Sequence, residues 1–322
     1  MSSSNSFVSG EASPPDIDRP FNGMVSATRH LIVTADDFGV DVRVNEAIEL
    51  AFTQGILTSA SLMMGGDAMA DAVERARRLK GLAVGLHITL ADGRPVLPRK
   101  RIPDLVDRDG RFRNDLFRCG VNWFFKPDIR RQVKAEIDAQ FAAFVRTGLV
   151  LDHANAHKHL HLHPTIAGVV ARIGRRYGLT ALRIPAEPRR IIKRAESGQA
   201  VPRSFLWPVL AILRRRARAA DLIINDYMFG LAWTGALTEA RLLALIPHLP
   251  AGVSELYAHP ATVDADEMPH AAPGYRYREE LAALMSPAVK AALAENGISL
   301  TRFSALASAL RPAAAEPQAR TA

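Results

Sequence analysis

The sequence predicts an α/β protein, a (β/α) barrel with about seven or eight parallel strands. Short apolar runs of strand length alternate along the chain with segments in which apolar residues recur every three or four positions. Regular alternation of this kind is typical of parallel strands joined by crossover helices, and it suits a barrel better than an open sheet. The chain shows no internal repeat and no linker, so one domain is expected over residues 28–310.

The individual elements follow from the composition of each segment. Strand candidates are aliphatic or β-branched runs that are too short for a helix. They lie at 31–35, 60–64, 82–86, 149–152, 180–184, 222–224 and 255–258, with 298–303 as an eighth candidate. Helix candidates fill the intervals, and each has one apolar face to pack against the strands. They lie at 44–54, 68–79, 129–146, 165–177, 239–246 and 279–295.

Composition narrows the class of protein. The 322 residues are 48% apolar, and the single cysteine, Cys119, excludes a disulfide scaffold or a thiolate zinc finger. Lys and Arg total 41 against 33 Asp and Glu, a net charge of +8. Nine basic and two acidic residues in the segment 186–220 carry +7 of this charge, so the rest of the chain is nearly neutral. Nucleic acid is therefore not an expected partner.

The two ends of the chain are interpreted as a disordered leader (1–27) and a disordered tail (311–322). The leader lacks the basic start and continuous apolar core of a secretory signal. The apolar stretch 205–213 is far shorter than the roughly 20 residues that cross a bilayer. These features predict a cytoplasmic protein. The sequence makes no prediction of an oligomeric state.

Polar residues stand where the predicted strands end. The carboxyl ends of barrel strands converge on one face, and active sites of this architecture are built there. The residues in these positions are Asp36, Asp37, His87, His153, His157, Arg183, Asp226 and His259. We therefore expect them to meet at one site.

The adjacent carboxylates of Asp36 and Asp37 end the first strand. Neighbouring side chains at a strand end point in different directions, so one carboxylate can bind a cation while the other accepts a proton from water. The alternative is structural: Asp37 would cap the following helix and Asp36 would be a turn residue in contact with water.

The histidines supply the second part of a metal site. His87 alone would be interpreted as a core residue, but five of the ten histidines lie between His153 and His163. Asp37, His87 and His157 would form a catalytic site for one divalent metal ion with positions left for water and substrate; zinc or magnesium is expected, and manganese or iron is not excluded. His159 and His161 would contact substrate. The alternative is a polar surface loop with a general affinity for transition metals.

Four motifs carry a family resemblance. Ala-Asp-Asp-Phe-Gly at 35–39, Gly-Leu-His at 85–87, the alternating histidines before Pro164, and Ala-His-Pro at 258–260 occur in the order found in the YdjC-like carbohydrate deacetylases. The chain resembles this family over residues 30–305. Segments 154–164 and 225–230 most resemble its branch associated with hopanoid biosynthesis. The resemblance implies a barrel of the polysaccharide-deacetylase and glycoside-hydrolase type, one divalent metal and an N-acetylated sugar substrate.

The resemblance also implies roles for single residues. The metal ligands of the family fall on Asp37, His87 and His157. The general base falls on Asp36 and the general acid on His259, which would protonate the departing amine. One departure is visible, because Asn155-Ala156 stand where many members have Asp-Ser, and a carboxylate that would support His157 is lost. Arg183 and Asp226 are further candidates for binding substrate, with a structural salt bridge as the alternative for Arg183.

The basic segment 186–220 suggests where the substrate is held. Apolar residues bordered by cations are typical of a segment that enters the headgroup region of an anionic membrane, and the alternative is a helix that covers the barrel. We therefore expect the substrate to be an N-acetylglucosaminyl hopanoid. The protein would deacetylate it while bound peripherally to the inner membrane. Three other functions stay open: a soluble chitooligosaccharide deacetylase, a metal-dependent phosphoesterase, and a non-catalytic protein that binds metal or nucleic acid.

Overall fold

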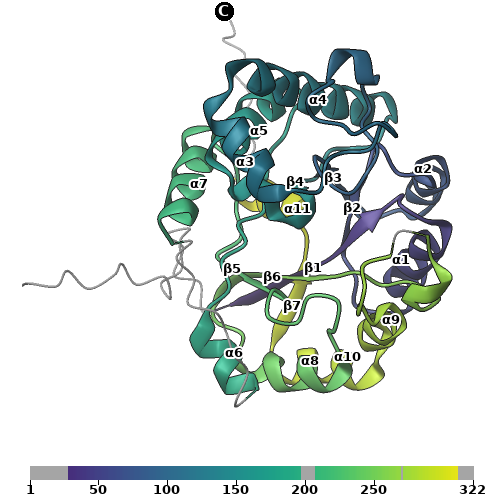
Figure 1. Cartoon of the computed structure of the whole chain (residues 1–322). Coiled ribbons are helices and arrows are strands. Elements are labelled where there is room, and N and C mark those ends of the chain that lie inside the picture. The colour runs from purple at the N-terminus through teal and green to yellow at the C-terminus, as the bar shows by residue number, and fades with distance from the viewer. Residues whose placement is uncertain (1–27, 197–206, 270, 311–322) are drawn as a thin grey trace, which may run out of the picture.

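The computed structural model describes residues 28–196, 207–269 and 271–310 (Figure 1). The expected leader, the expected tail and residues 197–206 of the basic segment lie outside the described residues. The strands are β1 (Arg29–Phe38), β2 (Ser59–Leu62), β3 (Ala83–Ile88), β4 (Ala154–Ala156), β5 (Tyr227–Phe229), β6 (Gly252–Ala258) and β7 (Ile298–Thr301).

Helices cover the outside of the sheet (Figure 1). They are α1 (Val42–Gln54), α2 (Met69–Arg78), α3 (Leu116–Phe125), α4 (Pro127–Arg146), α5 (Pro164–Arg176), α6 (Arg189–Ala195), α7 (Trp207–Ala219), α8 (Glu239–Leu245), α9 (Tyr277–Met285), α10 (Pro287–Glu295) and α11 (Phe303–Leu310). Four short 3₁₀ helices are η1 (Arg99–Arg101), η2 (His157–Leu162), η3 (Ile246–His248) and η4 (Ala265–Glu267).

The described strands form one curled parallel sheet. Six of them follow one another in the order β4-β3-β2-β1-β6-β5, and β7 pairs with the start of β1. The predicted α/β alternation with parallel strands is confirmed, but only as a half-barrel, and the complete barrel of seven or eight strands is not confirmed.

The missing strands have a local cause. The expected strands 180–184 and 222–224 make only the isolated bridges Ala154 to Leu182 and Ala181 to Ile223. Next to them, the Asn225 side chain donates to the carbonyl of Ile184 and accepts from its backbone N–H, so these groups are not available to a sheet partner. The expected strand 149–152 also falls short, because β4 begins at Ala154.

The predicted helices are found with one division. The expected helix 279–295 is two helices, because Ser286 ends α9 and caps α10 by accepting from the Val289 N–H, and Pro287 cannot continue the hydrogen bonding of α9. Helices α3 and α11 were not predicted, and α6 and α7 correspond to the alternative given for segment 186–220, a helix that covers the barrel. No helix among the described residues is both long enough and apolar enough to cross a membrane.

Side-chain alternation along the strands leads from an apolar floor to a polar site. Ile32 of β1 and Val253 of β6 pack with Ala181 and Phe303 in a small core cluster. Because every second side chain shares a face, Thr34 and Asp36 follow Ile32 on β1, and Glu255 and Tyr257 follow Val253 on β6. The carboxyl half of the same surface is therefore polar.

Candidate active site

Three predicted ligands come together at the carboxyl ends of the strands. Asp37 stands near the end of β1, His87 in β3, and His157 begins η2. One potential ligand atom from each lies within 4.8 Å of the others. Asp37 Oδ1 is 3.3 Å from His87 Nε2 and 3.1 Å from His157 Nδ1.

The backbone turns sharply at these residues. The pairing of β1 with β2 shifts register between Ala35 and Phe38, and Asp37 there has a positive φ of 63°. Lys158 and His159, which follow the third ligand, also have φ of 53°. Left-handed backbone is unfavourable for residues other than glycine, and such strain concentrates at functional sites.

The donor set fits a catalytic divalent metal. One carboxylate and two imidazoles are a combination used by zinc and other transition metals, and three protein ligands leave positions for water and substrate. Burial would raise the pKa of Asp37, but the charges and hydrogen bonds of His157 and His87 hold it well below its usual value. The carboxylate is therefore ionised, as a ligand must be.

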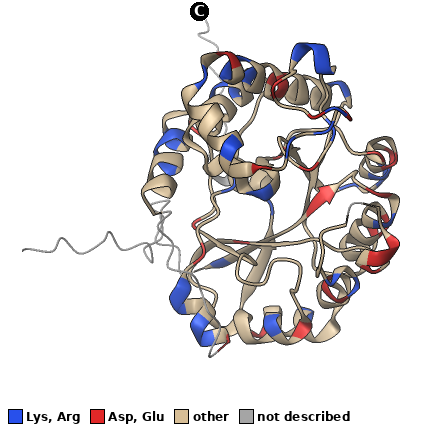
Figure 2. Cartoon of the chain, in the orientation of Figure 1, with Lys and Arg blue, Asp and Glu red and all other residues tan. Residues whose placement is uncertain are grey.

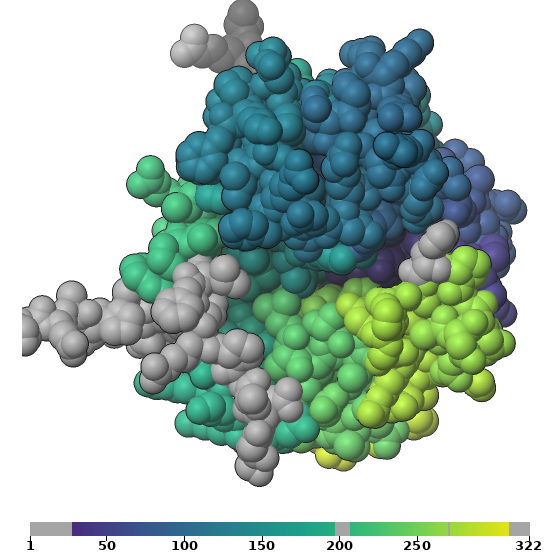
Figure 3. Space-filling model, viewed as in Figure 1, coloured from purple at the N-terminus to yellow at the C-terminus, as the bar shows by residue number. Residues whose placement is uncertain are grey.

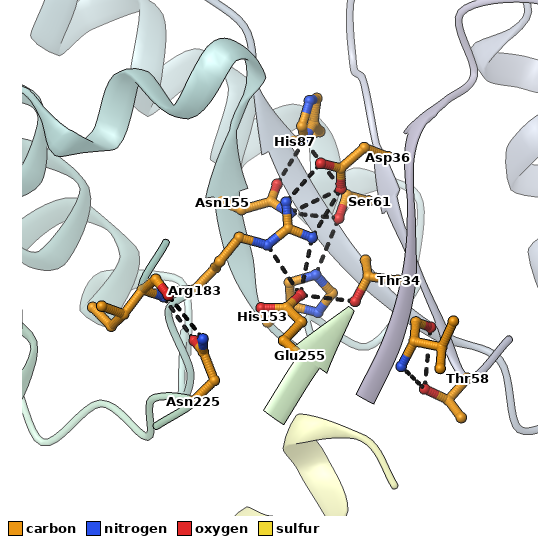
Figure 4. A network of polar contacts seen from close by, with 12 residues as sticks. Thr34, Asp36, Thr58, Ser61, His87, His153, Asn155, Arg183, Asn225 and Glu255 are labelled. Atoms are coloured by element: carbon orange, nitrogen blue, oxygen red, sulfur yellow. Dashed lines mark hydrogen bonds and ion pairs between the residues drawn. The ribbon is translucent and has the colours of Figure 1, made fainter. Parts of the chain in front are cut away.

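Asp36 belongs to a buried ion-pair network (Figure 4). Arg183 Nη1 lies 2.6 Å from Asp36 Oδ2, and Arg183 Nη2 donates to Asp36 Oδ1 at 3.0 Å. On its other side Arg183 Nε donates to Glu255 Oε1 at 3.0 Å, and Thr34 Oγ1 donates to the same oxygen at 2.8 Å. Burial would raise the pKa of Asp36, but Arg183 and His87 lower it.

The predicted substrate contact of Arg183 does not fit this position. Its side chain is fully buried, and its donors are directed at two carboxylates. The salt bridge kept as the alternative is what the structure shows. Arg183 instead holds both oxygens of Asp36 in a fixed orientation.

Asn155 links the two halves of the site (Figure 4). Its Nδ2 donates to Asp36 Oδ1 at 3.2 Å and to Ser61 Oγ at 2.7 Å. Since an ionised carboxylate only accepts, Oδ1 of Asn155 must accept from His87 Nδ1, at 2.6 Å. Nδ1 of His87 therefore carries a proton, and Nε2 faces Asp37 Oδ1 at 3.3 Å. The amide of Asn155 thus supports His87.

The chain of hydrogen bonds continues below Asn155. Ser61 Oγ lies 3.1 Å from His153 Nε2, and His153 Nδ1 lies 2.9 Å from Asp152 Oδ2. Burial would raise the pKa of Asp152, but the hydrogen bond and charge of His153 lower it, so Asp152 accepts from His153 Nδ1. The analysis of the sequence did not find Ser61, although its place at the end of β2 is a usable signal.

A pocket of about 840 Å³ opens above the cluster. In Figure 3 it is the hollow between the blue and the yellow-green parts of the chain. The predicted residues that line it are Asp36, Asp37, His87, His157, His159 and His259. His259 lies between Tyr257 and Tyr275, with ring centroids 5.4 and 5.1 Å away, and its Nδ1 has no hydrogen-bond partner among the described residues.

Two other predicted substrate contacts lie away from the pocket. His161 is fully buried, and burial together with the charge of Arg183 lowers its pKa to about 3. The alternation that was expected to align it with His159 fails because η2 is a kinked 3₁₀ helix and not an extended segment. Asp226 is also buried, where its Oδ2 accepts from the Val253 N–H at 2.9 Å.

The described part of the basic segment consists of α6 and α7, seen as blue bands in Figure 2. Some of its arginines form hydrogen bonds within the protein. Arg214 is buried and donates to the carbonyl of Asp226 at 3.2 Å, while Arg216 donates to the carbonyl of Pro164. Trp207 and Ile212 are 46% and 42% exposed. Helix α7 therefore packs on α5 with one face and exposes its other face to solvent.

Comparisons with known proteins place these residues in a family. The model of the YdjC-like proteins matches residues 30–295. A carbohydrate deacetylase of Geobacillus stearothermophilus is 31% identical over 85% of this chain and 97% of its own length. A carbohydrate deacetylase of Mus musculus is 33% identical, with 84% and 92% covered. A solved structure from Enterococcus faecalis V583, named for cellobiose-phosphate cleavage, has a TM-score of 0.68 and 28% identity, with 87% and 99% covered. The chain belongs to the YdjC-like family.

Proposed function

We propose that this protein is a metal-dependent deacetylase that hydrolyses the N-acetyl group of an N-acetylglucosamine-type sugar carried on a glycosylated hopanoid. The protein is a hydrolase of the carbohydrate deacetylase class, because relatives with that name match most of its length. The metal-dependent mechanism is supported by the cluster of Asp37, His87 and His157, which lies in a pocket that also holds Asp36 and His259.

Each side chain has a role in amide hydrolysis. Asp37, His87 and His157 would hold the divalent cation, which supplies Lewis acidity that acidifies water and polarises the acetyl carbonyl. Asp36, kept ionised and oriented by Arg183, accepts a proton from the attacking water. His259 donates a proton to the departing amine, because an unprotonated amide anion is a very poor leaving group.

The membrane part of the proposal rests on the open face of α7. Exposed Trp207 and Ile212 stand on the same helix as the exposed cations Arg215 and Arg218. Apolar and basic groups in this combination favour the headgroup region of an anionic bilayer. The protein would act in the cytoplasm, peripherally at the inner membrane.

A soluble chitooligosaccharide deacetylase is the second candidate. It is favoured by Arg214 and Arg216, whose contacts with the protein itself remove them from a membrane surface. This candidate uses the same catalytic residues and differs only in substrate.

The test compares acetate release from free diacetylchitobiose and from a membrane extract that contains glycosylated hopanoid, each with and without a chelator. Hydrolysis of the hopanoid alone, stopped by the chelator and restored by added zinc or magnesium, is expected. Efficient hydrolysis of the free sugar would favour the second candidate. Acetate release that ignores the chelator would overturn the metal mechanism.

A further inference from the structure

We propose that α3 docks on the surface of an anionic lipid bilayer and holds the mouth of the pocket against it. The segment 186–220 had been the only expected membrane contact. The proposal rests on the proposed function for the lipid-linked nature of the substrate. The docking surface itself consists of exposed apolar residues of α3 and the cations beside them.

The outer face of α3 is an apolar stripe. Its members and their exposed fractions are Phe117 (85%), Val121 (43%), Phe124 (50%) and Phe125 (71%). Successive residues of a helix turn by about 100°, so these four side chains fall within about 100° of one another. The opposite face is apolar too, with Cys119 and Trp123 buried against the protein. An exposed apolar stripe on a helix whose opposite face is already buried is normally covered by a partner or a membrane.

Cations border the stripe. The exposed ones are Arg118, Lys126 and Arg130. Among the described residues no carboxylate forms an ion pair with them, because Asp115 caps α3 by accepting from the Arg118 N–H at 3.0 Å and Asp128 pairs with Arg131. Exposed aromatic side chains with free cations beside them match an interface of acyl chains and anionic headgroups.

The stripe lies beside the catalytic pocket. Asn114, which lines the pocket, directly precedes the capping residue of α3. On the other side of the helix His163 Nε2 donates to the carbonyl of Gly120 at 3.0 Å, and His163 ends the segment that begins with the ligand His157. In Figure 3 the blue part of the chain, which includes α3, borders the hollow. A bilayer on α3 would therefore lie next to the pocket mouth.

A second copy of the chain fits this face less well. In a two-fold symmetric contact the same patch meets itself, so Arg118, Lys126 and Arg130 of both copies would be gathered at one interface. An anionic surface neutralises these charges and accepts the phenyl rings at the same time.

The experiment measures cosedimentation of the full chain with vesicles of phosphatidylcholine alone and of phosphatidylcholine mixed with phosphatidylglycerol. Wild type should bind the anionic vesicles. The triple variant Phe117→Ser/Phe124→Ser/Phe125→Ser should lower the partition constant by at least about tenfold, because three phenyl rings no longer enter the interface. Arg118→Glu/Lys126→Glu should remove the preference for anionic lipid.

Matched variants give the controls. Val145→Ser/Val150→Ser removes two exposed apolar side chains elsewhere on the surface and should bind like wild type. Trp207→Ser tests α7. Wild type that binds neither vesicle, a triple variant that binds as well as wild type, or binding lost only in Trp207→Ser would each overturn the proposal. So would a dimer in size-exclusion chromatography with light scattering that the triple substitution dissociates, since the stripe would then be an interface between copies.

Failure of the docking surface and failure of the proposed function are told apart with a detergent-solubilised substrate. The triple variant should deacetylate it at the wild-type rate, and an unchanged melting temperature should show that the fold is intact. Loss of vesicle binding with this activity retained supports the proposal. Wild type that binds vesicles but releases no acetate would leave docking in place and refute the deacetylase.

Discussion

At the amino end of the sheet the interior is apolar, with Ile32, Val253 and Phe303 packed together. At the carboxyl end the same strand faces carry Asp36 and Glu255, joined through the buried Arg183. The first region follows the ordinary rule that cores exclude charge. The second breaks it at the cost of desolvation, which ion pairing must offset. The comparison indicates that the amino end stabilises the fold and the carboxyl end is built for chemistry.

Asp37→Ala should give the largest effect on function. It removes the oxygen that lies closest to both histidines, so zinc binding measured by titration calorimetry should become undetectable. Acetate release should fall by at least about a thousandfold. The control Asp67→Ala removes an exposed pocket carboxylate outside the cluster and should leave zinc binding intact. Wild-type zinc affinity in Asp37→Ala would exclude this residue as a ligand.

Arg183→Met should give the largest effect on stability at the carboxyl end. It leaves Asp36 and Glu255 buried without their cation, which should lower the free energy of unfolding by about 3–5 kcal/mol in urea titrations. Arg172→Met, an exposed arginine of α5, should change it by less than about 0.5 kcal/mol. Equal stability of the two variants would show that the network contributes nothing to the fold.

Phe303→Ala tests the amino end, where the phenyl ring also lies below the polar network, with its centroid 5.2 Å from that of His153. Loss of a fully buried phenyl ring should cost about 3–5 kcal/mol of unfolding free energy, while zinc affinity stays at the wild-type value. This pattern, destabilised but with an unchanged metal site, sharpens the comparison. A loss of zinc affinity in Phe303→Ala would contradict the comparison, because the amino end of the sheet would then also determine metal binding.

The parts of the site that the sequence predicted are those that depend on strand ends. Asp37, His87 and His157 could be found because parallel strands bring their carboxyl ends together. The hydrogen-bond partners of buried side chains could not be predicted. Arg183 donates to Asp36 and Glu255, which lie 147 and 72 positions away in the sequence. The local sequence around Arg183 does not distinguish these contacts from a contact with substrate. Barrel closure was overestimated, because the side chain of Asn225 takes the place of a backbone ladder.

Helix α3 was missed for a different reason. Residues 116–125 are apolar on two opposite faces, and the polar residues Arg118 and Asn122 occupy only a narrow flank between them. The same property that hid the helix from the sequence analysis marks its outer face as a docking surface.

Asn155→Leu should have a moderate effect confined to the site. The side chain of Leu is branched at the same carbon as that of Asn155 but neither accepts from His87 nor donates to Asp36. Loss of a group that orients a ligand should lower zinc affinity by about 10–100-fold. Asn155→Asp keeps an acceptor for His87 but loses the donation to Asp36, so a smaller loss of affinity in this variant than in Asn155→Leu would assign the effect to the contact with His87. If both variants bind zinc like wild type, the hydrogen bond does not orient His87.

The smallest expected effect concerns Glu187, a partly buried carboxylate near the carboxyl end. Among the described residues no cation forms an ion pair with Glu187, and desolvation raises its pKa to about 7 even though it accepts three backbone N–H groups of residues 230–232. Asp36, beside Arg183, shifts the other way. A raised pKa stabilises the fold below the unfolded value of 4.5, and this contribution is lost as pH rises toward 7. Glu187→Gln carries no charge, so its unfolding free energy should rise relative to that of wild type as the pH increases between those limits. A constant difference between the two proteins would show that Glu187 is already ionised at low pH, with its N–H partners outweighing its burial.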